Sequence, residues 1–159
     1  MWLEYFDNAH IYGFDISDFS HMKHDRFTFV RGDAGSDIDM KRLAKSASGF
    51  DVIIDDGSHA SYHQQLAFKY LFPRLRPGGT YIIEDLQWQS PAYEGTLMPV
   101  PKTRDFMISF FEKREYLHNA LLSEEFMNAA NTAAAAYAWF PAFSGDPSPA
   151  KIFVIRKAT

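Results

Sequence analysis

The sequence predicts an α/β domain with a doubly wound, mostly parallel sheet, and three observations support this. Segments rich in β-branched and aromatic residues alternate with segments of helical periodicity, which is the pattern of a parallel sheet with right-handed crossovers. Four of the predicted strands end on acidic residues. The 159 residues are 47% hydrophobic and 16% aromatic, so one domain spanning 1–159 can bury a core.

The first half of the chain contains the βα alternation. Trp2, Leu3, Phe6 and Ala9 suggest a short opening helix, and Met40, Leu43, Ala44 and Ala47 recur at helical spacing. A third helix, capped by Ser58, carries the stripe Leu66, Ala67, Tyr70 and Leu71 and is expected to end at the LRPGG segment. The strands expected here are His10–Asp15, Arg26–Asp33, Phe50–Asp56 and Thr80–Glu84, of which FDVIIDD reads as buried on both faces.

The second half is less regular. Residues 87–102 are rich in Pro, Gly and aromatics, including Trp88 and Tyr93, and predict a long loop over an active site. A helix is expected over 103–122 from Phe106, Phe110, Leu117 and Leu121. Two strands, about 135–143 and Lys151–Arg156, are separated by SGDPSP and predict a C-terminal antiparallel hairpin.

Composition excludes several classes of function. The net charge of −4 without a long basic run gives no support for a nucleic-acid or membrane-surface partner. There is no cysteine, so disulfides and thiolate metal sites are excluded. No segment approaches the length of a membrane span, and the first residues do not resemble a signal peptide. A cytoplasmic protein is therefore expected, and a homo-oligomer is compatible with the sequence.

The acidic residues at the strand ends are the main functional signal. Ligands of such sheets bind beyond the carboxyl ends of the strands, where Asp15, Asp33, Asp55-Asp56 and Glu84-Asp85 are expected. Neighbouring strands lie about 4.8 Å apart, so Asp56, Glu84 and Asp85 could share one hard cation such as Mg²⁺, Mn²⁺ or Ca²⁺. Any single acid could equally well end a strand or cap a helix.

Two histidines follow the first acidic pair. His59 is expected in the first turn of a helix, where the helix dipole favours neutral imidazole, so that it could accept a proton. His59 and His63 also form H-x3-H, a spacing compatible with zinc, although no third nitrogen or sulfur ligand is evident. A solvent-facing histidine at a helix start is the plainer interpretation of His59.

Asp15 admits a cofactor interpretation. An acid that closes the second strand of a Rossmann-like unit typically binds the ribose hydroxyls of a nucleotide. S-adenosylmethionine and NAD both fit this role, and the acid alone does not choose between them.

The segments IYGFDIS, FVRGDAGSD, DDGSH and PGGTYIIEDL together resemble the metal-dependent O-methyltransferases that modify sugars of macrolides and related antibiotics, over about residues 1–90. The resemblance implies a Rossmann-like fold, S-adenosylmethionine, Mg²⁺ and a small-molecule hydroxyl acceptor. It implies Asp56, Glu84 and Asp85 as metal ligands and His59 as general base. Asp15 is implied for the ribose of the cofactor and Asp33 for the neighbourhood of its adenine.

One departure from that family stands out. A strand with an acidic, glycine-rich loop precedes the opening helix in the family, and this sequence starts within the helix. We therefore expect an N-terminally truncated domain that lacks its first strand, which lies between the strands ending at Asp15 and Asp56. Two alternatives to the metal-assisted O-methyltransferase stay open: an inactive fragment that acts through protein contacts, and an NAD-dependent sugar enzyme, which lacks its G-x-G-x-x-G.

Overall fold

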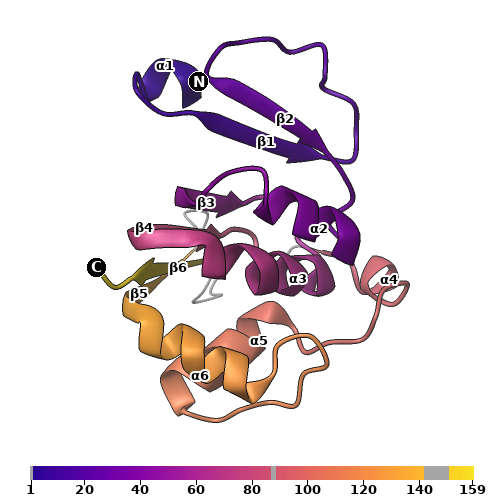
Figure 1. The fold of residues 1–159 in the computed structure, drawn as a ribbon. Coiled ribbons are helices and arrows are strands. Elements are labelled where there is room, and N and C mark those ends of the chain that lie inside the picture. Colours follow the sequence, from indigo (N-terminus) through magenta and orange to yellow (C-terminus); the bar gives the residue numbers. More distant parts are fainter. Residues whose placement is uncertain (1, 87–88, 142–150) are drawn as a thin grey trace.

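The computed structural model describes residues 2–86, 89–141 and 151–159, and Figure 1 shows strands and helices alternating through its first half. The strands are β1 (Ile11–Asp15), β2 (Phe27–Arg31), β3 (Phe50–Asp55), β4 (Leu75–Ile83), β5 (Ala134–Phe140) and β6 (Ile152–Lys157). The α-helices are α1 (Trp2–Tyr5), α2 (Asp37–Ala44), α3 (Ser61–Leu71), α4 (Pro91–Glu94), α5 (Thr103–Ile108) and α6 (Glu124–Ala133). A 3₁₀ turn covers Phe72–Arg74, and a π-helical turn covers Ser109–Lys113.

The strands pair as the alternation predicts. β1 pairs with β2 in parallel, and β3 pairs with β4 in parallel. β6 lies antiparallel to β4 and to β5, which gives the order β3-β4-β6-β5 and confirms the C-terminal hairpin. Its SGDPSP connection lies outside the described residues. The α/β class is thus confirmed: the four strands of the first half pair in parallel, and the C-terminal hairpin adds the antiparallel pairings.

β1 and β3 form no ladder with each other in the part of the chain that the structure describes. The pair β1-β2 lies beyond β3 in Figure 1, and the two groups of strands meet through side chains. Tyr12 of β1 contacts Phe50 of β3 edge to face, with ring centroids 5.6 Å apart. Each of these strands therefore has an edge on which its backbone is not paired by another described strand.

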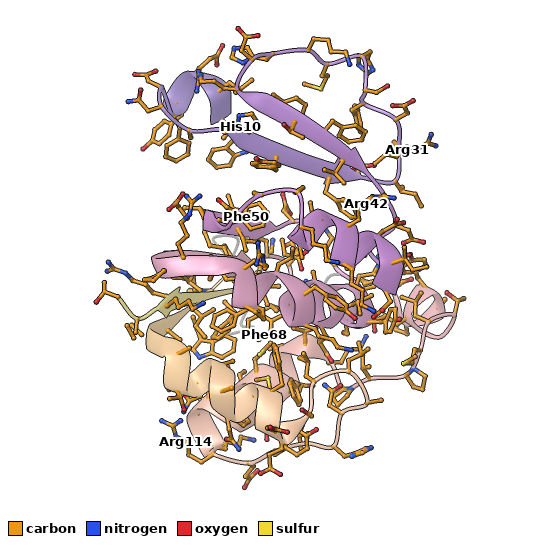
Figure 2. The ribbon with its side chains drawn as sticks, in the orientation of Figure 1. His10, Arg31, Arg42, Phe50, Phe68 and Arg114 are labelled. Atoms are coloured by element: carbon orange, nitrogen blue, oxygen red, sulfur yellow. The ribbon has the colours of Figure 1, made fainter. Side chains whose placement is uncertain are left out.

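The core lies on one face of the four-stranded sheet. Tyr81, Ile83, Phe153 and Ile155 point from the strands into one cluster with α2, α3, α5 and α6. Phe68 stands at its centre, in ring contact with Tyr81 and with Phe126 of α6 (Figure 2).

The opposite face of the sheet is more open. Val52 is 51% exposed and Ile54 38% exposed, whereas Ile53 between them belongs to the cluster formed with α2, α3, α5 and α6. The expectation that FDVIIDD is buried on both faces is therefore wrong for this chain. Val and Ile runs do not by themselves reveal whether a second layer is present.

Helix α2 follows its sequence signals, and α3 departs from them. Ser36 caps α2 through its hydroxyl, which accepts from the Asp39 N–H at 3.3 Å. α3 begins only at Ser61, after Ala60, so Ser58 is not its cap. The helix ends at Leu71 rather than at LRPGG, and that segment belongs to β4.

The Pro-Gly-Gly segment forms a bulge instead of a helix stop. The register between β3 and β4 shifts from Phe50↔Leu75 to Val52↔Thr80, so extra residues of β4 are accommodated there. Gly78 has φ 77°, a conformation that favours glycine.

The C-terminal half differs most from the prediction. The helix expected over 103–122 ends after its π-helical turn at Arg114, which has φ 62°, so Leu117 and Leu121 are not helical. Helix α6 was not predicted; Ser123 caps it by accepting from the Phe126 N–H at 3.1 Å. No helix among the described residues is both long and apolar enough to cross a membrane.

Candidate metal and proton-transfer site

The two acidic pairs lie side by side, as their places after neighbouring strands predict. β3 and β4 are parallel, so their carboxyl ends meet at one edge of the sheet. The Glu84 N–H donates to the Asp55 carbonyl at 2.9 Å, which extends the ladder to the point where both strands end. The side chains that follow are therefore held close together.

Asp56, His59 and Asp85 form one group of potential metal ligands. Each offers one donor atom, and these atoms all lie within 4.8 Å of one another. The His59 Nε2 is 3.9 Å from the Asp85 Oδ2. Two of the three predicted carboxylate ligands are thus in the group, joined by the predicted base.

Glu84 is outside this group but within its electric field. Burial raises the pKa of Glu84, and the charges of Asp56 and Asp85 raise it further. His59 and Lys151 act in the opposite direction on the same carboxyl. Such crowding of carboxylates disfavours their ionised forms unless a cation is nearby.

Both His59 and Asp85 have left-handed backbone conformations. Their φ angles are 59° and 49°, a region that non-glycine residues enter at a cost on the order of 1 kcal/mol. His59 precedes α3 instead of lying in its first turn, so the predicted position of His59 within the helix is wrong. These two left-handed residues are the ones whose side chains approach each other to 3.9 Å.

Asp55 points away from the ligand group and into the protein. Its Oδ2 is buried and has no hydrogen-bond partner among the described residues. Burial raises the pKa of Asp55 to about 6, opposed by a hydrogen bond from the Gly57 N–H and reinforced by the charge of Asp56. The sequence analysis treated the two aspartates as one acidic pair, although consecutive strand residues face opposite sides.

His63 does not join His59 in a zinc pair. Its Nδ1 is 2.6 Å from the Ser58 Oγ, and its ring contacts that of Tyr93 with centroids 6.2 Å apart. Burial lowers the pKa of His63, against the charges of Asp33 and Glu94. His63 therefore connects Ser58, in the turn before α3, with Tyr93, in the segment after β4. The donor group described above does not contain His63.

The loop after β4 folds over the start of α3. The Gln89 amide donates to the Ser58 carbonyl at 2.6 Å. The Glu94 Oε1 accepts from the Ser61 N–H at 3.1 Å and from its hydroxyl at 3.0 Å, and Lys102 pairs with the same oxygen at 3.1 Å. The predicted loop thus lies next to the turn that carries His59; Trp88 lies outside the described residues.

Lys151 is a residue of the site that the sequence did not indicate. Its Nζ is 2.8 Å from the Asp85 Oδ1, and its side chain is 46% exposed. It enters from the start of β6, far along the chain, and only the pairing of β6 with β4 brings it there.

Asp15 and Asp33 lie at the ends of β1 and just beyond β2, and both are exposed. The Asp15 Oδ1 accepts from the Ser17 N–H at 2.7 Å, and the Asp33 Oδ1 accepts from the Gly35 N–H at 2.8 Å. These are turn-forming bonds of the kind that strand-terminal aspartates often make. Neither belongs to the donor group, and their cofactor roles stay predictions.

Comparison with known proteins supports the resemblance seen in the motifs. The chain is 44% identical over 101 residues to demethylmacrocin O-methyltransferase of Streptomyces fradiae and 41% identical over 101 residues to mycinamicin VI 2''-O-methyltransferase of Micromonospora griseorubida. Each alignment covers 62% of this chain and 25% of the relative, so the chain spans only about a quarter of the length of these proteins. No family model matches the chain.

Among solved structures, the fold is similar to that of the methyltransferase MycE of the mycinamycin biosynthetic pathway, determined in complex with Mg and SAH. The TM-score is 0.70 at 26% identity, and the match covers 99% of this chain and 39% of MycE. A second MycE structure, which also contains mycinamycin VI, gives a TM-score of 0.69. The predicted similarity to mycinamicin-type sugar O-methyltransferases is thereby confirmed.

Proposed function

We propose that this chain carries the metal-binding and proton-accepting part of an S-adenosylmethionine-dependent O-methyltransferase that acts on a sugar hydroxyl of a small molecule. The observation that carries the proposal is the meeting of Asp56, His59 and Asp85 at the ends of two parallel strands. The relatives named above support the substrate class, since they are O-methyltransferases of sugar-bearing antibiotics by name.

The residues present fit a hard divalent cation. Asp56 and Asp85 supply carboxylate oxygens, and Glu84 is close enough for its pKa to be raised by both. Oxygen donors select Mg²⁺, Mn²⁺ or Ca²⁺ over softer metals. When bound, such a cation would offset the mutual repulsion of the carboxylates and lower the pKa of an acceptor hydroxyl.

His59 is proposed as the group that accepts the hydroxyl proton. Its backbone turn fixes the ring beside Asp85, whose Oδ2 is 3.9 Å from the Nε2 and can stabilise the imidazolium that proton uptake produces. Methyl transfer from sulfur to oxygen then requires chiefly that donor and acceptor be held in line. Asp15 and Asp33 are proposed for the ribose and the adenine side of the donor.

Calorimetric titration with Mg²⁺ tests the metal site. We expect the 159-residue chain to bind Mg²⁺ and Asp56→Asn to weaken binding at least about tenfold. Asp51→Asn, which alters an exposed carboxylate on the same strand, is the matched control and should leave the affinity unchanged. Equal affinities for the wild-type chain and Asp56→Asn would refute the proposed site.

A second titration, with S-adenosylmethionine, addresses the cofactor. Binding that weakens in Asp15→Ala supports the methyltransferase assignment, and transfer of a labelled methyl group to a glycosylated macrolide would establish the reaction. Metal binding without cofactor binding would instead favour an inactive fragment.

A further inference from the structure

A buried glutamine on α3 holds the peptide that joins two of the proposed metal ligands. Gln64 is 1% exposed and lies on α3, which also buries Leu66 and Phe68. Its Nε2 donates to the Glu84 carbonyl at 2.9 Å. That carbonyl belongs to the peptide between Glu84 and Asp85.

This peptide lies in the acidic turn, the segment Glu84–Leu86 that follows β4. On one side of it, the Glu84 N–H continues the ladder to the Asp55 carbonyl. On the other side, Asp85 adopts its φ of 49°, and the Leu86 N–H donates to the Lys151 carbonyl at 3.1 Å. The orientation of the peptide plane couples ψ of Glu84 to φ of Asp85, so a hydrogen bond to its oxygen restrains the backbone conformation of both residues.

We propose that Gln64 is a positioning residue for the metal site: its amide fixes the Glu84–Asp85 peptide and thereby keeps Asp85 in the donor group with Asp56 and His59. The inference rests on the function proposed above. Gln64 touches neither the cation nor the substrate, and its effect passes through the backbone alone. Groups that orient ligands in this way typically change metal affinity by about 10–100-fold when removed.

The neighbouring residue provides a matched control. Gln65 is also fully buried on α3, but it faces a different direction, since successive helix positions are rotated by about 100°. Its Nε2 donates to the Pro101 carbonyl at 2.7 Å, and its Oε1 accepts from the Asn119 amide at 2.7 Å. By contrast, the Gln64 Oε1 is buried without a hydrogen-bond partner in the described chain.

The test compares Gln64→Met with Gln65→Met in the 159-residue chain. Methionine keeps the length and volume of each side chain while removing its polar atoms. We expect Gln64→Met to raise the Kd for Mg²⁺ by about 10–100-fold, and Gln65→Met to change it by less than about threefold. Melting temperature should follow the opposite order, because Gln65→Met removes hydrogen bonds to Pro101, Thr103 and Asn119, whereas Gln64→Met removes the one to Glu84.

A second readout reports the hydrogen bond directly. The carbonyl ¹³C resonance of Glu84 should shift in Gln64→Met and stay in place in Gln65→Met. If the wild-type chain binds Mg²⁺ and Gln64→Met binds it equally well, or if the Glu84 resonance is unchanged, the positioning role is overturned while the proposed function stands. If the wild-type chain binds no Mg²⁺, the proposed function fails and the role fails with it.

Discussion

Asp55 should make the protein less stable at neutral pH than at mildly acidic pH, and Asp55→Asn should remove this effect. Its pKa rises from the ordinary 3.8 to about 6 in the folded chain because of burial. One pKa unit corresponds to about 1.4 kcal/mol, so the charged carboxylate opposes folding by about 3 kcal/mol. Asparagine keeps the oxygen that accepts from the Gly57 N–H and carries no charge.

The sign and the pH window follow from this direction. Below pH 3.8 the carboxyl is protonated in both states, so Asp55 costs nothing. As the pH rises from 3.8 to about 6, the unfolded chain releases the proton and the folded chain retains it, so the stability falls. Above about 6 the loss is complete, and Asp55→Asn should exceed the wild-type protein by about 3 kcal/mol.

The assay is urea unfolding of both proteins between about pH 4.5 and 8, with a chelator present so that no metal ion holds the acidic turn. The difference in unfolding free energy isolates Asp55, because His63 and the other titrating groups are common to both proteins. Asp51→Asn, which alters an exposed carboxylate of the same strand, is the control and should not reproduce the gain in stability at neutral pH. A constant difference for Asp55→Asn across the range would refute the reasoning.

Other changes test separate parts of the molecule. His59→Gln should lower kcat of methyl transfer by about 10²–10⁴ while the Kd for Mg²⁺ stays within about threefold; a large loss of Mg²⁺ affinity, measured by calorimetry, would make His59 a ligand instead of a base. Lys151→Gln removes a half-exposed ammonium 2.8 Å from Asp85 that would compete with the metal ion for this carboxylate. It should tighten Mg²⁺ binding by up to about fivefold in the same calorimetric measurement. Weaker binding would contradict this competition. Ser123→Ala removes the cap of α6 and should cost about 1 kcal/mol in urea unfolding, whereas Thr132→Ala near the end of that helix should not destabilise it; equal losses would argue against a specific capping effect.

The part of the fold that the sequence predicts is the part with strong local signals. β3 and β4 were expected from β-branched runs, and their neighbouring positions from the single crossover between them, which together placed Asp56 beside Asp85. Helix α6 has a start signal that was missed, Ser123 followed by Glu124 and Glu125, while its end is obscured by the alanine run that leads into β5. The helix over 103–122 was overestimated, since apolar spacing continued past the left-handed turn at Arg114.

The site was predicted in its residue types and less well in its geometry. His59 and Asp85 reach each other through left-handed turns, which neither residue type specifies. Lys151 and Gln64 enter through tertiary contacts, and no spacing in the sequence connects them to the acidic pairs. Burial of Asp55 depends on which face of β3 is covered, a property that only the packed structure defines.

The ligand group and the bonds that support it come almost entirely from the single unit β3-α3-β4, between Asp55 and Leu86. A site built from a contiguous stretch closes only short loops, so little chain entropy is lost when it assembles. The strands that carry Asp15 and Asp33 share no ladder with this unit in the described chain. The acidic turns are therefore expected to form together with β3, α3 and β4, without requiring that β1 and β2 be paired first.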